Sequence, residues 1–437
     1  MKKWMGLVLA LLLLSASLAG CGKGGEQGAA PAGQPAAAEG EKGPLHLLQP
    51  GTEQGYYHVA DSGAFGNYTG GGVILFADYE NGREVPLCAD PACTHSDDTC
   101  PAWVRPWEAG DTLLVEGQML LGWGNGYEHP YRLTAMDLDG GRRRTLCELD
   151  NGESWMYGGV PALWGVPLAV RCAGDGRELY FLVQVGTGGE STVQVRAVPL
   201  AGGAQRTVAA LDHEDVHLCG ALGRELILLV RDVQAQEGDG PWYKGAVVRL
   251  LAVDTDTGAQ REAAAWPLEE FVQGTCGPDA YYDVEKATGH IWRTDLATGA
   301  RADTGWPGPQ GSSQDSAYLE GVCAGRLILS TWVDRGEEQW ANPRWAVDLS
   351  TGEAAEIGLT VYVEEKMGSR PAPVLAQTEK ELYLVEEQRT EHRTLPGLQG
   401  APEDRMFTTQ VCCLVPKEDF FASDLRGSRR VLPWGID

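Results

Sequence analysis

The feature that most restricts how this chain of 437 residues can fold is a pair of short apolar segments that recurs along it. The first members of the pairs are residues 56–59, 113–121, 178–183, 225–230, 280–284, 326–331 and 381–385. The second members run into turns and are residues 73–78, 131–137, 193–200, 247–254, 291–295 and 344–348, with a weaker seventh copy at 410–415. Short apolar runs joined by turn residues predict β-hairpins.

The turns share a chemistry that explains their form. In residues 254–258, 295–299 and 348–352 the pattern is Asp-x-x-Thr-Gly, where the Asp side chain accepts hydrogen bonds from the turn and Gly takes a positive φ angle. The turn glycines are Gly82, Gly140, Gly203, Gly258, Gly299 and Gly352. Their spacing suits four strands and one long loop per unit, and such units repeated radially protect their sheet edges. We therefore predict an all-β fold, a β-propeller of seven blades, or of six if the C-terminal copy pairs with the first strand to close the ring.

Composition agrees with this fold and excludes one class of partner. The chain holds 58 Gly and 24 Pro, which indicates many turns, and its 14 Trp and 14 Tyr favour strands. With 43% hydrophobic and 22% charged residues it can bury a sizeable core. The formal net charge of −26 would repel a polyanion, so nucleic acid is excluded as a partner.

The N-terminus has the features of a targeting segment. Met1, Lys2 and Lys3 precede an apolar run, residues 4–14, that is too short to span a bilayer as a mature helix. Residues 18–21 read Leu-Ala-Gly-Cys, which resembles the lipobox of bacterial lipoproteins. The resemblance implies cleavage before Cys21 and acylation of its thiol, with palmitate among the acyl chains, as a lipid anchor. An ordinary secretory signal with a chance cysteine is the alternative.

The segment behind Cys21 lacks large apolar residues as far as Gly43, so it cannot collapse and would act as a tether. We therefore divide the chain into a signal peptide at residues 1–20, an acylated cysteine and Gly/Ala/Pro-rich tether at 21–44, and a propeller domain at 45–437. The expected location is the extracytoplasmic face of the cell membrane, where the chain is held by its lipid.

Two further segments carry a resemblance at the level of fold. Residues 292–299 and 347–352 resemble the blade ends of quinoprotein-like and other bacterial propellers. Together with the lipobox, the tether, the cysteine-rich residues 87–102 and the late Pro-Lys-Glu-Asp-Phe at 416–420, the chain resembles propeller-bearing lipoproteins of Gram-positive anaerobic bacteria. This resemblance implies fold and location but no activity.

The most specific chemical motif is Cys88-x4-Cys93-x-His95-x4-Cys100. Three thiolates and an imidazole form a tetrahedral Zn²⁺ set, and a set of four protein ligands would make the site structural. A disulfide among these cysteines, with the remaining thiol spare or paired with Cys147, is the competing interpretation for an exported protein. Both interpretations stay open at this point, and structural zinc is the only cofactor that the sequence indicates.

Other cysteines are expected to be structural. Four of them precede the first strands of their units and are expected to be small buried side chains, too far apart to bridge: Cys172, Cys219, Cys276 and Cys323. The adjacent pair Cys412 and Cys413 should point to opposite faces of a strand, one inward and the other exposed or paired elsewhere.

Candidates for catalysis and binding are few. Residues 212–217 gather acids with His213 and His217, which could hold a divalent cation, although a solvated acidic loop is the favoured interpretation. The sequence has no Gly-x-Ser-x-Gly or phosphate-binding Gly-Lys-Ser/Thr motif. Among the aromatic residues of the long loops, Trp242 and Trp340 are the best candidates for exposed ligand-binding rings.

These observations favour a membrane-anchored extracytoplasmic lipoprotein whose propeller binds a protein or carbohydrate ligand through long loops on one face. Whether it is an enzyme is uncertain, and the absence of a Gly-x-Ser-x-Gly or Gly-Lys-Ser/Thr motif favours binding. The alternative is a glycan-active hydrolase or lyase with acids from several blades meeting in the propeller funnel.

Overall fold

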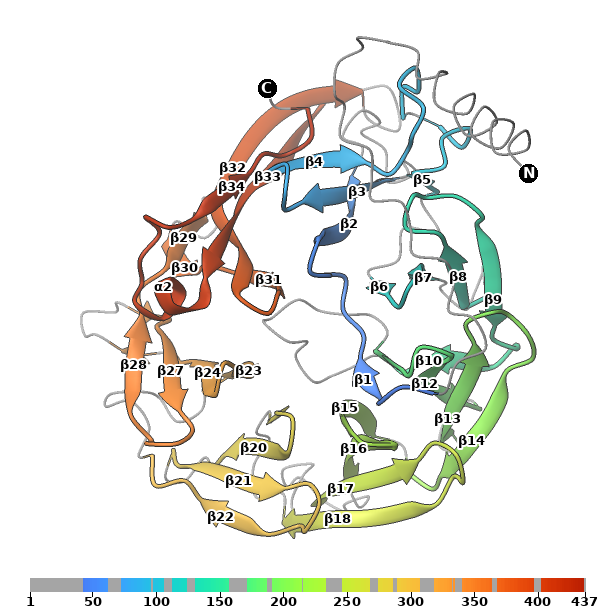
Figure 1. Ribbon diagram of the computed structural model, residues 1–437, viewed down its shortest axis with the longest axis vertical. Coiled ribbons are helices and arrows are strands. Elements are labelled where there is room, and N and C mark those ends of the chain that lie inside the picture. The colour runs from blue at the N-terminus through green and yellow to red at the C-terminus, as the bar shows by residue number, and fades with distance from the viewer. Residues whose placement is uncertain are drawn as a thin grey trace, which may run out of the picture.

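Seven antiparallel sheets follow one another around a common axis in the computed structural model of the chain (Figure 1). The structure describes residues 42–61, 72–95, 97–105, 112–123, 130–156, 171–186, 191–213, 215–232, 246–267, 274–285, 289–306, 318–331, 333–334, 340–363, 368–396 and 402–435. The lipidation candidate Cys21 and the aromatic candidate Trp242 lie outside these residues.

Each sheet is one blade, and the blades follow the chain order. Blade 1 comprises β2 (Gly55–Asp61), β3 (Gly72–Asp78), β4 (Arg83–Pro86) and β5 (Trp103–Val104). Blade 2 comprises β6 (Thr112–Val115), β7 (Met119–Trp123), β8 (Arg132–Met136) and β9 (Arg144–Glu148). Blade 3 comprises β10 (Glu153–Trp155), β11 (Cys172–Gly174), β12 (Glu178–Val185), β13 (Thr192–Pro199) and β14 (Arg206–Leu211). Blades 4 and 5 comprise β15 (Val216–Leu222), β16 (Glu225–Asp232), β17 (Val247–Asp254) and β18 (Gln260–Pro267); and β19 (Thr275–Cys276), β20 (Ala280–Val284), β21 (Ile291–Asp295) and β22 (Arg301–Asp303).

Blade 6 comprises β23 (Tyr318–Cys323), β24 (Arg326–Ser330), β27 (Arg344–Asp348) and β28 (Ala354–Ile357); blade 7 comprises β31 (Val374–Gln377), β32 (Glu381–Pro396), β33 (Pro402–Pro416) and β34 (Arg429–Val431). Two hairpins lie outside the blades, β25 (Val333–Asp334) with β26 (Trp340–Ala341) and β29 (Thr360–Val363) with β30 (Gly368–Pro371). The chain is therefore a seven-bladed β-propeller, and the weak C-terminal copy forms a complete blade.

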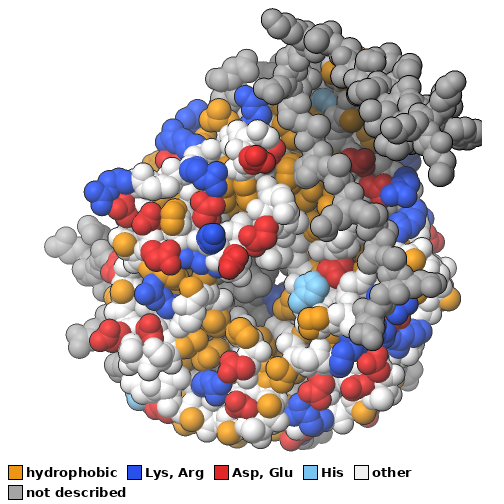
Figure 2. Space-filling view, in the orientation of Figure 1, with side chains coloured by type: hydrophobic (Ala, Val, Ile, Leu, Met, Phe, Trp, Pro, Cys, Tyr) orange, Lys and Arg blue, Asp and Glu red, His pale blue; other side chains and the backbone are white. Residues whose placement is uncertain are grey.

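Burial explains why the two middle strands of a blade carry the apolar runs seen in the sequence. β16 and β3 are buried almost throughout, because neighbouring blades cover both faces of each sheet. The outer strand β18 instead alternates between exposed and half-buried side chains, since it faces solvent at the rim. Figure 2 shows acidic and basic side chains interspersed around that rim.

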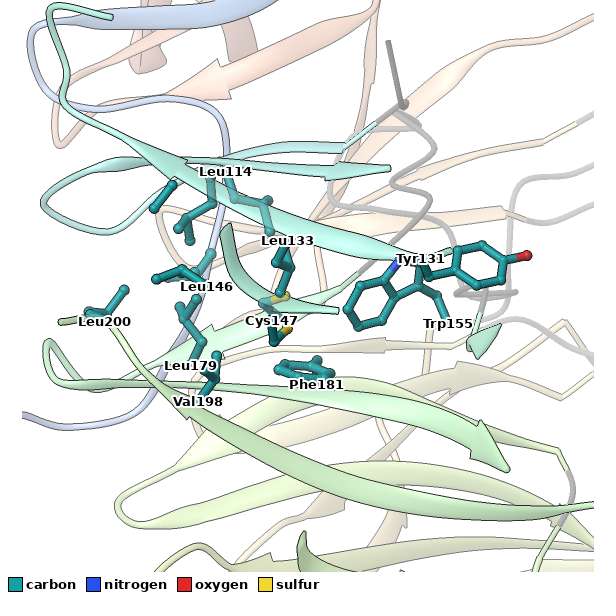
Figure 3. Close-up of a cluster of buried hydrophobic side chains, with 14 of the residues drawn as sticks. Leu114, Tyr131, Leu133, Leu146, Cys147, Trp155, Leu179, Phe181, Val198 and Leu200 are labelled. Atoms are coloured by element: carbon teal, nitrogen blue, oxygen red, sulfur yellow. The ribbon is translucent and has the colours of Figure 1, made fainter. Parts of the chain in front are cut away.

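The cores lie between blades. Figure 3 shows one of them, where Leu133 and Leu146 of blade 2 meet Leu179, Phe181 and Val198 of blade 3. Trp155 closes this cluster with its ring edge-on to Phe181, at 5.1 Å between centroids. Neighbouring blades are thus held together mainly by the packing of large apolar side chains from their facing sheets.

The hairpin turns confirm the turn chemistry expected from the sequence. The carboxylate of Asp254 accepts hydrogen bonds from the backbone N–H and hydroxyl of Thr257 at 2.7 and 2.8 Å, and Asp295 and Thr298 repeat the arrangement. Gly258 and Gly299 have φ angles of 72° and 73°. A feature that the sequence did not indicate is that these two glycines also pack against the preceding blade, where a Cβ atom would come within 2.3 Å of the Val208 carbonyl oxygen or 2.0 Å of that of Ala263.

The two faces of the propeller differ in their connections. Because the strands are antiparallel, tight turns such as β11–β12, β15–β16 and β17–β18 all lie on one face, which we call the turn face. The longer connections, such as β2–β3, β16–β17 and β24–β27, join strand ends on the opposite face, the loop face.

The segment that precedes blade 1 is docked on the turn face at blades 3 and 4. β1 (His46–Leu47) pairs with the inner strand β11, as Figure 1 shows near the axis, and the N–H of Gly43 donates to the carbonyl of Asp175 at 2.8 Å. Lys42 forms ion pairs of 2.9 Å with Glu178 and with Asp256, at turns of two blades. Lys42 and Gly43, assigned above to the tether, therefore already contact the propeller.

The last residues of the chain close the ring against blade 1. The backbone of Leu432 accepts a hydrogen bond from the N–H of Glu84 at 2.8 Å and donates one to the carbonyl of Gly82 at 2.9 Å. Arg429 of β34 also donates to the carbonyl of Tyr79 at 2.9 Å. Closure thus joins the outer strand β4 to the C-terminal segment, rather than adding a strand at the axis.

Two expectations about cysteines need correction. Cys412 and Cys413 point to opposite faces of β33, as expected, yet both are buried, because each face of a blade packs on a neighbour. Cys172, Cys219 and Cys323 are buried inner-strand residues as predicted. The expectation that these inner-strand cysteines stay too far apart to bridge is wrong for Cys219 and Cys276, whose sulfur atoms are 3.2 Å apart.

Candidate metal centre and binding face

The loop after β4 brings the four residues of the Cys/His motif together. Short turns shape it, with the N–H of Cys93 donating to the carbonyl of Asp90 at 3.1 Å and that of Cys100 donating to the carbonyl of Asp97 at 3.1 Å. The loop returns to blade 1 through β5, which pairs with β3. Both ends of the motif are therefore fixed to the same sheet.

The ligand atoms of Cys88, Cys93, His95 and Cys100 all lie within 4.8 Å of one another. The imidazole Nδ1 of His95 is 3.3 Å from the Cys100 sulfur, and the backbone N–H of His95 lies 3.4 Å from the Cys93 sulfur. A tetrahedral zinc ion with bonds of about 2.0–2.3 Å holds its ligands roughly 3.5–3.8 Å apart. This group is the only one of its kind among the described residues, and none of its thiols is in a disulfide.

The backbone at His95 is unusual for a residue with a side chain. Its φ angle is 52°, in the left-handed region that favours glycine. Such conformations concentrate at functional sites, where surrounding structure holds them. Here the conformation directs the imidazole toward the sulfur of Cys100.

Burial sets the protonation tendencies of the group. Burial raises the pKa of the Cys100 thiol to about 12, and burial also raises the pKa of the Cys88 thiol. Burial lowers the pKa of His95, which favours the neutral imidazole that ligates metals. A divalent cation would reverse the tendency of the thiols, since metal coordination deprotonates them. With four protein ligands no position is left for substrate, so the group suits a structural role.

The motif lies next to the ring closure. His95 packs edge-on against Trp434, with ring centroids 5.9 Å apart, and the N–H of Trp434 donates to the carboxylate of Glu84 at 3.2 Å. Trp434 is 40% exposed. The sequence analysis missed this residue, because nothing in the local sequence relates the end of the chain to blade 1.

The histidines of residues 212–217 have other partners than a cation. His217 lies 2.6 Å from the carboxylate of Asp215, and His213 lies 2.6 Å from that of Asp232. Arg231 and Arg249 also contact these two carboxylates, at 3.5 and 2.6 Å. The arginines already neutralise these two carboxylates, which argues against a cation there. The expectation of a solvated loop is wrong for Val216 and His217, which are buried residues of β15.

Buried carboxylates within the described part of the chain are likewise engaged. Arg344 forms a 2.8 Å ion pair with Glu320, and both side chains are about 95% buried. Arg301 holds Asp283 through bonds of 2.6 and 2.7 Å while its guanidinium lies over the ring of Trp266 at 4.4 Å. Each of these acids is already paired with a guanidinium group, whereas a catalytic pair of acids needs one carboxyl group without such a partner.

Two tyrosines that the sequence analysis did not single out are exposed on the loop face. Tyr362 in β29 is 57% exposed and Tyr318 at the start of β23 is 36% exposed, and both lie where loop-face connections meet the strands. Trp340 lies in β26, paired with Asp334, and its side chain is outside the described residues. Tyr362 could have been found from its polar-apolar alternation in residues 360–363.

Blade 7 extends further on the loop face than the other blades. β32 pairs with β31 only as far as Leu384, and β33 pairs with β34 from Cys412 onward, yet the β32–β33 ladder continues to Pro396 and Pro402. We call residues 387–396 and 402–411 the blade 7 arm. Its backbone forms a two-stranded ribbon beyond the four-stranded sheet, visible as the long arrows in Figure 1.

Within the described residues, no helix is long and apolar enough to cross a membrane. No known protein-family model matches the chain, and no curated protein matches it either.

Solved structures with related architecture are distant. A puromycin hydrolase is 16% identical with a TM-score of 0.42, and the match covers 85% of this chain and 58% of the hydrolase. Dipeptidyl peptidase 4 of Porphyromonas gingivalis is 9% identical with a TM-score of 0.43, over 85% of this chain and 57% of the peptidase. Oligogalacturonate lyase of Vibrio parahaemolyticus is 10% identical with a TM-score of 0.42, over 91% and 88% of the two chains. The chain thus spans less than three fifths of the two hydrolases, and similarities this low transfer no activity to it.

Proposed function

We propose that this chain is a membrane-anchored extracytoplasmic lipoprotein whose propeller binds a protein or carbohydrate ligand on its loop face. The observation that supports this most is the docking of residues 42–48 on the turn face. A lipid on Cys21 connects to the propeller through Lys42, so the membrane attachment reaches the turn face. The loop face, with Tyr318, Tyr362 and the blade 7 arm, is then directed away from the point of attachment.

Binding rather than catalysis fits the described side chains better. The buried acids Glu320 and Asp283 are neutralised by arginines, whereas a hydrolase acid pair needs one carboxyl group free to be protonated. Exposed tyrosines supply large contact area at small entropic cost.

We further propose that the Cys88, Cys93, His95 and Cys100 group holds one structural zinc ion. Its role would be to fix a loop whose exposed residues 89–92 and 97–99 have little apolar surface to pack.

The anchoring part is tested by feeding cells an alkyne analogue of palmitate and measuring label and membrane fractionation. Wild type and Cys88→Ser should carry label, and Cys21→Ser should lose both label and membrane association. Label that persists in Cys21→Ser would contradict the proposed anchor.

The binding part is tested by placing a photo-crosslinking residue at Tyr362 on the loop face and, as a matched control, at the exposed Thr351 on the turn face of the same protein. Cross-linking of one defined wall glycan or protein from Tyr362 and not from Thr351 supports recognition on the loop face. Equal cross-linking from both positions would contradict it. Turnover of the captured glycan by purified protein would replace the binding function with the enzymatic alternative.

A further inference from the structure

Two thiols from neighbouring blades meet beside the inner strands. The sulfur atoms of Cys219, in β15 of blade 4, and Cys276, in β19 of blade 5, are 3.2 Å apart. The thiol of Cys219 also donates to the carbonyl of Ile227 at 3.3 Å. A disulfide bond is about 2.05 Å long, so roughly 1 Å of closing separates the two residues from a covalent link.

The backbone around Cys219 is arranged to allow this approach. The β15–β16 register shifts between Leu218 and Gly220, so Cys219 is the extra residue of a β-bulge. A Cβ atom at Gly220 would lie 2.9 Å from Cys276 Cβ and 3.0 Å from its sulfur. Only glycine leaves room for the Cys276 side chain at this point. Bulge and glycine together bring two sheets closer than the regular blade spacing that the sequence analysis assumed.

One thiol of the pair is buried and the other, Cys276, is half-buried. Cys219 is 3% exposed, and Arg171, which donates to the carbonyl of Leu218 at 3.2 Å, covers the neighbouring backbone. The hydrogen bond with Cys219, together with burial, raises the pKa of Cys276 well above its ordinary value. Thiols in this state react slowly once the protein is folded, and a bond formed earlier would be protected from reductants.

We propose that Cys219 and Cys276 form a disulfide that joins blade 4 to blade 5. The two thiols reduce an external disulfide of the thiol–disulfide oxidoreductase or glutathione class. One protein thiolate attacks that external disulfide and forms a mixed disulfide with one half of it. The other half leaves as the first thiol. The second protein thiolate then attacks the protein sulfur of the mixed disulfide. The protein S–S bond forms, and the remaining half of the external disulfide leaves as the second thiol. Two electrons pass from the protein to the external disulfide, which becomes two thiols, and these take up the two protons that the protein thiols lose.

The bond would act where the fold has no backbone link. Backbone hydrogen bonds hold each blade together, but the described contacts between blades 4 and 5 are mainly side-chain packing, in the cluster that contains Cys219 and Tyr281. Cys219 and Cys276 are 57 positions apart in sequence, so a covalent bridge between them would close a long loop of the chain. The chemistry itself is independent of the proposed function, although an exported location would supply the oxidising conditions.

Peptide mapping tests the proposal directly in the wild-type full chain. The protein is produced in an exporting host, denatured with iodoacetamide present, and digested with trypsin without reduction. Cys219 and Cys276 fall in tryptic peptides 207–224 and 262–286, each with a single cysteine, and Cys323 falls in the control peptide 302–326. We expect the first two peptides to be recovered joined, two hydrogens lighter than their sum, and the control peptide to be alkylated. Recovery of both peptides singly alkylated, even after incubation of the unfolded chain with oxidised glutathione during refolding, would overturn the proposal.

Thermal unfolding provides a second readout. Reduction of wild type in the unfolded state, followed by refolding, should lower the melting temperature by about 4 °C or more, and the same treatment should shift Cys219→Val much less. Cys323→Val is the matched control, because it loses a buried inner-strand cysteine and should keep the full redox-dependent shift. An equal shift in Cys219→Val and wild type would show that other thiols cause the effect, which would also overturn the proposal.

Discussion

The indole of Trp434 meets the imidazole of His95 edge-on, with 5.9 Å between ring centroids. One ring belongs to the Cys/His loop of blade 1, and the other ends the segment that closes the ring behind blade 7. The candidate metal centre and the closure of the propeller are therefore in physical contact. Loss of order in one of them should destabilise the other.

The metal content of the purified chain follows from the convergence of four ligands. We expect about one zinc ion per chain in wild type, nearly none in Cys100→Ala, and the wild-type amount in the control Cys323→Ala, which removes a buried thiol elsewhere. Elemental analysis with intact mass measures this. A wild-type protein free of metal and two hydrogens lighter in the peptide that holds Cys88, Cys93 and Cys100 would establish a disulfide there instead.

The closure itself can be weakened at Trp434. Replacing it by alanine removes an edge-on aromatic contact, and we expect a loss of about 1 kcal/mol in the free energy of unfolding by urea. The more exposed Tyr362→Ala serves as control and should change the free energy by less than about 0.5 kcal/mol. If zinc orders the loop, chelation should reduce the effect of Trp434→Ala, and an effect unchanged by chelation would separate the two features.

The turn glycines allow the backbone conformation and the contact between blades to be separated. Gly299 and Gly352 have φ angles of 73° and 74°, but a Cβ atom at Gly299 would meet the Ala263 carbonyl at 2.0 Å, while Gly352 has open space. Gly352→Ala should cost about 1 kcal/mol from the left-handed conformation alone. Gly299→Ala should cost about 2 kcal/mol more because blade 4 must move. Equal losses in urea unfolding would show that the turns of blade 5 do not rest on blade 4 in solution.

The buried ion pair of Glu320 and Arg344 offers a test in blade 6. Glu320→Gln leaves the Arg344 charge without its counter-charge, and we expect a loss of about 3 kcal/mol or more in unfolding free energy. Replacing both partners by Leu and Met should recover much of this loss. The exposed pair Glu387 and Arg389 is the control, where Glu387→Gln should cost less than about 1 kcal/mol. A Glu320→Gln protein as stable as wild type would contradict the burial of this charge.

Acid should weaken the ion pairs of Glu178 with Arg206 and with Lys42 of the docked segment. Hydrogen bonds from Arg206, and then from Lys42 and Tyr180, outweigh burial and lower the pKa of Glu178 from 4.5 to about 2. Because the folded-state pKa is depressed, the stabilisation is complete above about pH 4.5 and is lost as the pH falls toward 2. The unfolding free energies of wild type and Glu178→Gln should differ by about 1 kcal/mol at pH 6, because solvent screens this partly exposed cluster, and should converge near pH 2. A difference that stays constant between pH 6 and pH 2.5 would contradict this assignment.

Much of the architecture follows from local sequence. Apolar runs such as residues 225–230 are long enough for strands covered on both faces, and Asp-x-x-Thr-Gly defines the turn that follows the partner strand, residues 247–254. Local chemistry suffices here, because a hairpin is set by residues close together in the chain. The Cys/His motif was visible for the same reason, since its four ligands lie within one loop.

Contacts between blades could not be read in this way. The bulge that brings Cys219 to Cys276 and the packing of Gly299 on Ala263 both depend on the distance between neighbouring sheets. The burial of both Cys412 and Cys413 has the same origin, because a strand in a blade has no solvent face.

The sequence by itself determined the hairpins, their turns, the propeller fold and the set of four candidate ligands, since each arises from residues near one another along the chain. The tertiary structure alone decided the closure of Leu432 on β4, the docking of Lys42 on the turn face and the meeting of Cys219 with Cys276. These relationships join residues distant in sequence, and they arise because the ring closes only when every sheet packs against two others.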